Sequence, residues 1–285
     1  MTETEHLLSA ADAECVDAAN ARFAFRRFGR RSDVPLVMAM RFRGTIDDWD
    51  PALLDVLSSE RDVIVFDNLG TGGSSGEPPA TIGALADGLL TFVDALELTQ
   101  IDLLGWSIGG FVVQAAALRR PELVRRLIVA GSGPGRVPDL PATPEKVLQI
   151  MAKPVNDDDD LLYLFFPDTD TGREAGRAST ARIEARRRAS HPEVGPEAVQ
   201  GQLAAVTSFG TGGWDRLPEL TMPVLVANGA HDVMINAFAS YAMSQRLPGA
   251  KVILYSDAGH GFLFQHADEF GHEVLRFLAG TGTRP

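Results

Sequence analysis

The 285-residue chain has little cysteine and no long hydrophobic run. A single cysteine, Cys15, excludes an internal disulfide framework and a cysteine-rich metal site. No stretch approaches the ~18 consecutive apolar residues that cross a bilayer. The first twenty residues carry five acidic side chains and lack the basic segment and apolar run of a secretory signal. We therefore expect a cytoplasmic protein with no membrane partner.

Basic residues are also scarce relative to acidic ones. The chain has 26 Lys and Arg against 38 Asp and Glu, a formal net charge of −12. This balance disfavours a surface that clamps nucleic acid or anionic lipid. Two local charge runs stand out, the acidic residues 157–160 and the basic residues 186–188. Adjacent carboxylates cannot all face one ion, so we interpret the acidic run as a solvated turn or helix N-terminus. We interpret the basic run as a solvated helix face.

Short apolar runs alternate with helical patterns along most of the chain. The predicted strands are Arg22–Phe28, Leu36–Met40, Val63–Phe66, Ile101–Leu104, Leu127–Ala130, Val224–Ala227 and Val252–Tyr255. The predicted helices are Pro51–Leu57, Thr81–Leu96, Phe111–Arg119, Ala237–Arg246 and Phe264–Leu278. Asp50 is a plausible N-cap for the first helix, and a turn near Asn20 leads into the first strand. Such alternation predicts an α/β fold with a mostly parallel central sheet and helices on both faces.

The region from Gly131 to about Asp215 interrupts this alternation. It opens with a loop rich in glycine and proline, continues with helical patterns and contains no convincing strand. A helical insertion between two core strands is typical of a cap placed over a site. We therefore divide the chain into an N-terminal core part (1–134), a helical cap (135–215) and a C-terminal core part (216–285).

Ser107 occupies the most informative position in the sequence. It lies in Gly105-Trp106-Ser107-Ile108-Gly109, between the predicted strand 101–104 and the predicted helix 111–119. A side chain at Gly105 or Gly109 would crowd a tight turn there. The following helix N-terminus offers backbone N–H groups to a developing oxyanion. In this context the G-x-S-x-G pattern indicates a nucleophile elbow, the alternative being a glycine-rich turn that only packs.

A serine nucleophile needs a base, and the base needs an orienting acid. His260 has a suitable setting, because it lies between two glycines in a loop that follows the last predicted strand. Asp232 follows the strand 224–227 directly, at the sheet edge where catalytic groups of α/β folds collect. Less suitable substitutes for the acid are Asp215 and Glu219. Less suitable substitutes for the base are His6, His191, His231, His266 and His272.

With these motifs, the sequence from about Arg22 to Leu278, apart from the cap, resembles the α/β-hydrolase fold superfamily. The turn Asp67-Asn68-Leu69-Gly70-Thr71-Gly72-Gly73-Ser74 after an early strand also resembles the family pattern. The resemblance implies acyl transfer to water: Ser107 attacks, His260 accepts its proton and Asp232 holds the imidazole. A serine at the elbow argues against the dehalogenase and epoxide hydrolase chemistry that uses an aspartate in this fold. The resemblance also implies that the reaction requires no metal and no organic cofactor.

One departure from the family pattern follows the strand at Leu36. Family members commonly carry His-Gly there, whereas this chain has Met40-Arg41. The resemblance still implies an oxyanion hole made by the backbone N–H groups of Phe42 and Ile108. Arg41 and Arg43 have two open roles. They bind an anionic substrate group, or they pair with a carboxylate among Asp47, Asp48 and Asp67.

Large apolar side chains flank the catalytic positions and recur in the cap. The predicted substrate-binding residues are Trp106, Met234, Phe262, Phe165, Phe166 and Phe209. They favour a small-molecule partner, a small to medium apolar ester or lactone. Two alternatives stay open: the same residues serve C–C bond hydrolysis or a lyase reaction, or the chain is a ligand-binding, receptor-like protein with an unused triad.

Overall fold

A computed structural model of the protein describes residues 13–18, 21–187, 192–209, 213–247 and 249–280. In these ranges an eight-stranded sheet has the order β1-β2-β4-β3-β5-β6-β7-β8. Strands β4, β3, β5, β6, β7 and β8 run parallel, β2 pairs antiparallel with β4, and β1 pairs antiparallel with β2 at the sheet edge. The predicted fold class is confirmed. The strands are β1 (Glu14–Ala18), β2 (Ala21–Phe28), β3 (Leu36–Ala39), β4 (Val63–Phe66), β5 (Ile101–Trp106), β6 (Val124–Ala130), β7 (Val224–Gly229) and β8 (Lys251–Tyr255).

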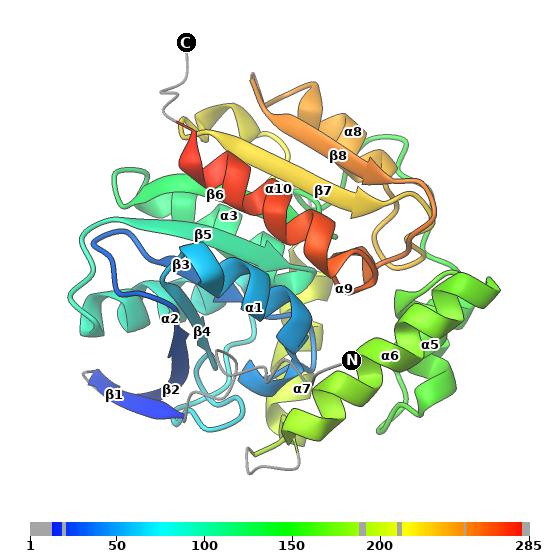
Figure 1. Ribbon diagram of the computed structural model, residues 1–285, viewed down its shortest axis with the longest axis horizontal. Coiled ribbons are helices and arrows are strands. Elements are labelled where there is room, and N and C mark those ends of the chain that lie inside the picture. Colours follow the sequence, from blue (N-terminus) through cyan, green and yellow to red (C-terminus); the bar gives the residue numbers. More distant parts are fainter. Residues whose placement is uncertain (1–12, 19–20, 188–191, 210–212, 248, 281–285) are drawn as a thin grey trace.

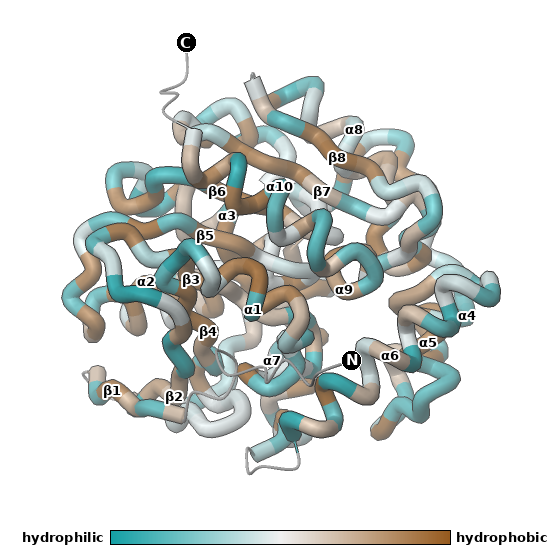
Figure 2. The backbone as a smooth tube through the Cα atoms, viewed as in Figure 1, coloured by the Kyte–Doolittle hydropathy of each residue, from teal (hydrophilic) through white to brown (hydrophobic). Residues whose placement is uncertain are grey.

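Helices cover both faces of the sheet (Figure 1). Helices α1 (Pro51–Glu60) and α10 (Ala267–Ala279) pack on one face, and α2 (Ile82–Ala95), α3 (Ile108–Arg119) and α8 (Phe238–Ser244) pack on the other. Successive strand residues point to opposite faces. Val37 of β3 therefore joins the α2–α3 cluster, while Met38 joins the α1–α10 cluster. Burial on both faces explains the hydrophobic central strands, which are brown in Figure 2.

The element boundaries follow local signals, with two exceptions. Helix α1 begins as predicted, since the Asp50 carboxylate accepts the Ala52 N–H at 2.9 Å. Strand β1 was not predicted, because it is short, half exposed and ordered by pairing with β2. The predicted final helix is two helices, α9 (Phe262–Gln265) and α10, separated at His266. The predictions for His6, Asn20, Arg188 and His191 lie outside the described residues.

Four α-helices and a short 3-10 helix, η2 (Leu217–Glu219), occupy the described residues between β6 and β7. The α-helices form the inserted region. They are α4 (Glu145–Met151), α5 (Asp158–Phe165), α6 (Asp170–Arg187) and α7 (Pro196–Ser208). Helices α5 and α6 lie near the end of the sheet toward which the β7 arrow points (Figure 1). The acidic run begins α5 as predicted, with the Asp157 carboxylate accepting the Asp160 N–H at 2.8 Å. The division into core and cap at residues 134 and 215 stays a prediction.

Ion pairs connect one face of α6 to the segment that includes the short helix η1 (Ile46–Asp48) and precedes α1. The prediction of a solvated face is wrong for Arg186, whose side chain is only 9% exposed, whereas the Arg187 side chain is 43% exposed as predicted. Helix α6 has few apolar residues, so charge contacts replace a hydrophobic face. The pairs are Arg182–Asp50, Arg186–Asp47 and Arg187–Asp48.

Within the ranges that the structure describes, no helix has both the length and the apolar character of a bilayer span.

Candidate active site

Ser107 lies at the turn between β5 and α3 in a strained backbone conformation. Its φ and ψ are 59° and −122°, a region that residues other than glycine seldom adopt. Two hydrogen bonds hold the turn: the Ser107 N–H donates to the Ala130 carbonyl at 3.0 Å, and the Ser132 hydroxyl donates to the Ser107 carbonyl at 2.7 Å. The surrounding strands therefore maintain a conformation that the residue alone would leave.

Two glycines make the turn sterically possible. A Cβ atom at Gly105 would lie 2.2 Å from the Gly109 carbonyl oxygen. One at Gly109 would lie 2.1 Å from the Ala39 carbonyl oxygen at the end of β3. Both separations are far below van der Waals contact, and both obstacles are backbone atoms. The crowding predicted for side chains at these two positions is thus present in the structure.

We expect Gly109→Ala to lower the free energy of unfolding by about 1–3 kcal/mol, the usual effect of overpacking. The new methyl group can be accommodated only if β3 and α3 separate. Gly195→Ala is a matched control, because nothing lies within 4 Å of a Cβ atom there and its φ is −68°. Urea denaturation of both variants measures the effect, and equal midpoints would contradict the steric argument.

The predicted acid and base are in contact. His260 Nδ1 lies 2.7 Å from Asp232 Oδ2, and both side chains are fully buried. The other carboxylate oxygen, Oδ1, accepts the N–H groups of Met234 and Ile235, each at 2.8 Å. Trp106 Nε1 donates to the His260 carbonyl at 3.1 Å and so fixes the histidine loop. Asp232 therefore presents one oxygen to the backbone and the other to the imidazole.

The second imidazole nitrogen, Nε2 of His260, is buried and has no hydrogen-bond partner among the described residues. The ring packs between Phe165, at 5.8 Å between centroids, and Trp106, at 5.6 Å. An unsatisfied buried polar atom is unfavourable for stability, and this one belongs to the predicted base. The Ser107–His260 hydrogen bond is thus not formed here, and such bonds commonly tighten only when substrate binds.

Two backbone N–H groups near Ser107 are available as donors. Phe42, after β3, and Ile108, the first residue of α3, line the same cavity as Ser107. Within the part of the chain that the structure describes, neither N–H has a hydrogen-bond acceptor. These are the two groups that the sequence predicts for the oxyanion hole, and their assignment to that role stays a prediction.

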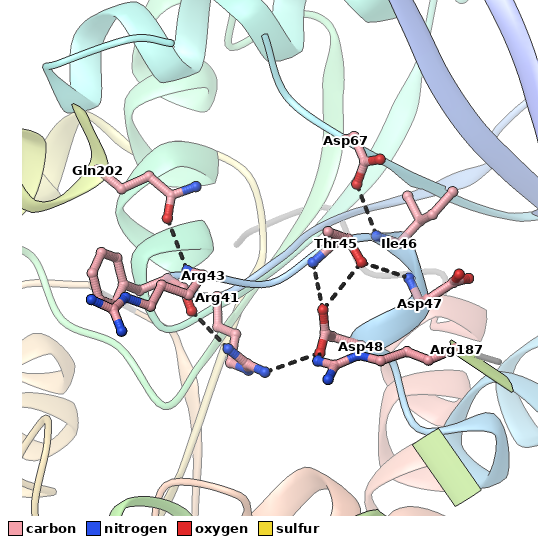
Figure 3. A network of polar contacts seen from close by, with 10 residues as sticks. Arg41, Arg43, Thr45, Ile46, Asp47, Asp48, Asp67, Arg187 and Gln202 are labelled. Carbon is pink, nitrogen blue, oxygen red and sulfur yellow. Dashed lines mark hydrogen bonds and ion pairs between the residues drawn. The ribbon is translucent and has the colours of Figure 1, made fainter. Parts of the chain in front are cut away.

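Arg41 and Arg43 take different partners. Arg41 donates to Asp48 at 3.1 Å, which is the structural pairing considered for it (Figure 3). Burial lowers the pKa of Arg41, while the Asp48 carboxylate raises it. Arg43 donates to the side-chain oxygen of Asn156 at 3.2 Å and to the Met151 carbonyl at 3.3 Å, so it contacts the segment between α4 and α5. Burial lowers its pKa as well.

A cavity of about 980 Å³ opens beside Ser107. Met234, Phe166 and Phe209, three of the predicted substrate-binding residues, line it. Phe165 lines a smaller neighbouring cavity of about 30 Å³ that also reaches Ser107. Three of the six predicted residues therefore border the main cavity.

The prediction that Trp106 and Phe262 line the cavity is wrong. Both side chains are fully buried in the cluster around α1 and α10. The Trp106 ring packs against Phe264 at 4.8 Å between centroids, and the Phe262 ring packs against Phe270 at 5.2 Å. Trp106 and Phe262 are neighbours of the catalytic residues in sequence, but their side chains pack in the core rather than against the cavity.

Sequence reasoning missed much of the cavity wall. The loop after β6 and helix α4 supply apolar side chains, among them Leu140, Pro144 and Leu148. The glycine- and proline-rich loop has no periodicity that could have pointed to them. Leu148 lines the cavity and is also 55% exposed, so part of its side chain faces solvent. His231, predicted at the rim, also lines the cavity.

The described residues contain no group of three or more His, Cys, Asp or Glu side chains that could hold a metal ion.

A solved alpha/beta hydrolase fold protein from Chitinophaga pinensis is 32% identical, with a TM-score of 0.88, covering 97% of this chain and 100% of that one. A Rhizobium rhizogenes protein named "Putative carbamate hydrolase RutD" is 27% identical over 85% of this chain and 92% of its own length. The pimeloyl-[acyl-carrier protein] methyl ester esterase of Aliivibrio salmonicida is 26% identical over 88% of this chain and 93% of its own length. The model of the alpha/beta hydrolase fold family matches residues 42–267, and the chain belongs to this family.

Proposed function

We propose that the protein is a serine hydrolase that cleaves a carboxylic ester or lactone of an apolar substrate. The observation that carries this proposal is the buried contact between Asp232 and His260, which leaves His260 Nε2 unpaired in the site that contains Ser107. An unpaired imidazole nitrogen on a ring held by a buried aspartate is available to accept a serine proton. The similarity to a methyl ester esterase supports an ester as the scissile group.

The reaction that these groups can perform has two stages. Ser107 Oγ attacks the carbonyl carbon while His260 Nε2 takes its proton, and Asp232 stabilises the imidazolium. The N–H groups of Phe42 and Ile108 receive the negative charge on the carbonyl oxygen. His260 then returns the proton to the leaving alkoxide, and the acyl-enzyme remains. Water attacks the acyl carbon with His260 as base, which releases the acid and restores Ser107.

The cavity indicates what kind of substrate fits. Its volume of about 980 Å³ lies at the upper end of the range for small-molecule sites. Most of the wall is aliphatic or aromatic, and polar side chains such as Arg136 and Asp168 belong to a minority of the lining. We therefore assign an apolar acyl or alcohol group of medium size to the cavity.

Intact-mass analysis after exposure to a phosphonate probe for serine nucleophiles tests the proposal. We expect one covalent adduct on the parent protein and none on Ser107→Ala, because only an activated serine displaces the leaving group. Ser240→Ala is a matched control, since Ser240 is also buried but lies in α8. An adduct that persists in Ser107→Ala would contradict the assignment of the nucleophile. No adduct on the parent, together with no hydrolysis of a p-nitrophenyl ester panel, would favour a ligand-binding protein.

A further inference from the structure

Arg41 is a buried cation at a position where the family pattern has glycine. Its side chain is 11% exposed, and its guanidinium carbon lies 5.1 Å from the centre of the Phe165 ring and 5.7 Å from the Trp106 ring. Burying a guanidinium is unfavourable unless its donors are paired with good geometry. Burial accordingly lowers the pKa of this side chain. Arg41 is therefore expected to make specific polar contacts.

The Arg41 guanidinium connects the chain segment of the predicted oxyanion hole to an aspartate. Nη1 donates to the Phe42 carbonyl at 2.8 Å, and Nη2 donates to Asp48 Oδ1 at 3.1 Å. The N–H of the same Phe42–Arg43 peptide donates to the Gln202 side-chain oxygen at 2.8 Å (Figure 3). The peptide is thus held at both its oxygen and its nitrogen. Arg43 has a left-handed backbone with φ of 56°, which these two bonds stabilise.

Asp48 is itself held in a fixed orientation. Its Oδ2 accepts the Thr45 N–H at 2.7 Å and the Thr45 hydroxyl at 3.1 Å, a reciprocal capping arrangement at the start of η1. Its Oδ1 accepts from Arg41 and from Arg187 of α6. The anchor for Arg41 is therefore preorganised, and no rotation of Asp48 is needed to hold the guanidinium.

We propose that Arg41 is the positioning residue of the oxyanion hole. By tying the Phe42 carbonyl to Asp48, it fixes the peptide backbone on either side of Phe42 and so directs the Phe42 N–H toward the cavity beside Ser107. Each terminal nitrogen of Arg41 makes one of these contacts, so the guanidinium is held at two points. Gln202 of α7 holds the nitrogen of the same peptide, which extends the support to the inserted helices. This inference rests on the proposed function of Ser107.

The test compares Arg41→Met, Arg41→Lys and Arg187→Met. For Arg41→Met we expect kcat on a p-nitrophenyl ester to fall about 100-fold, the effect of displacing a catalytic group by roughly 1 Å, with KM changed by less than about threefold. Arg41→Lys should recover part of kcat, because it restores one donor and the charge. Arg187→Met removes the other arginine on Asp48 but leaves the Phe42 contact, so its kcat should stay within about threefold of the parent value.

Amide hydrogen exchange of residues 40–46 gives a readout that does not depend on activity. We expect these amides to exchange at least about tenfold faster in Arg41→Met than in the parent or in Arg187→Met, because the segment loses its tether. Unchanged exchange overturns the positioning role, whether or not the parent hydrolyses esters. A parent that hydrolyses no ester contradicts the proposed function instead. A loss confined to KM would assign Arg41 to substrate binding and overturn the inference. If Arg41→Met does not fold, the same comparisons are made with Arg41→Lys.

Discussion

Asp232→Asn should lower kcat by about 10⁴-fold while the fold is retained, because it traps the histidine in the wrong tautomer. The reason lies in the two oxygens of Asp232. Oδ1 accepts the backbone N–H groups of Met234 and Ile235, so an amide NH₂ group cannot occupy that position without facing two donors. An asparagine must therefore place its oxygen there and its NH₂ group toward His260.

The substitution changes which nitrogen of the His260 ring carries the proton. Nδ1 of His260 would accept a hydrogen bond from the new amide, so the single ring proton would move to Nε2. A protonated Nε2 cannot take the hydroxyl proton of Ser107, and the nucleophile stays inactive. Geometry and packing hardly change, which separates this loss of chemistry from a loss of structure.

The matched control is Asp257→Asn. Asp257 Oδ1 lies 3.0 Å from His266 Nε2, a second Asp–His pair outside the cavity and partly exposed. We expect this variant to keep kcat within about twofold, since an exposed pair contributes little. Steady-state kinetics with one p-nitrophenyl ester and thermal unfolding of both variants make the measurement. If Asp232→Asn loses less than about tenfold in kcat, Asp232 is not the orienting acid.

The sequence alone allowed the prediction of features that depend on local pattern. The strand Val63–Phe66 is a continuous apolar run, and the turn at Ser107 is framed by glycines that the geometry requires. Asp50 and Pro51 specify the start of α1 within two residues. In each case the interacting groups are close neighbours in the chain, so their spacing carries the information.

The features that could not be predicted depend on contacts between distant segments. Arg187 and Asp48 are 139 positions apart, and nothing in either local pattern links them. Arginine side chains are mostly exposed in proteins, so the sequence of α6 offered no reason to expect its buried ion pairs. Trp106 adjoins Ser107 in sequence, yet it ends a strand whose residues alternate between faces, and it points away from the cavity.

Asp47→Ala should reduce the free energy of unfolding by about 3–5 kcal/mol, the effect of breaking a buried ion pair by removing one partner. The Asp47 side chain is 1% exposed and lies 3.0 Å from Arg26 Nη2 and 3.6 Å from Arg186 Nε. Its removal takes away the carboxylate that these two buried cations share. The guanidinium groups then repel each other in a region of low dielectric constant.

Arg186→Met is expected to leave the free energy of unfolding unchanged within about 1 kcal/mol, because Asp47 keeps Arg26 as its ion-pair partner and no buried charge is left unpaired. Burial, followed by the nearby charge of Arg26, lowers the pKa of Arg186 to about 10, so its charge is held unfavourably. Methionine keeps a flexible apolar chain over the Phe28 ring, which the guanidinium carbon now approaches at 5.1 Å. The double variant combines Arg186→Met with Asp47→Ala, so one of the two cations is already absent when the carboxylate is removed. Asp47→Ala should therefore lower the free energy of unfolding less in this background than in the parent. Urea denaturation of the full cycle measures this coupling, and additive effects would show that Asp47 acts independently of Arg186.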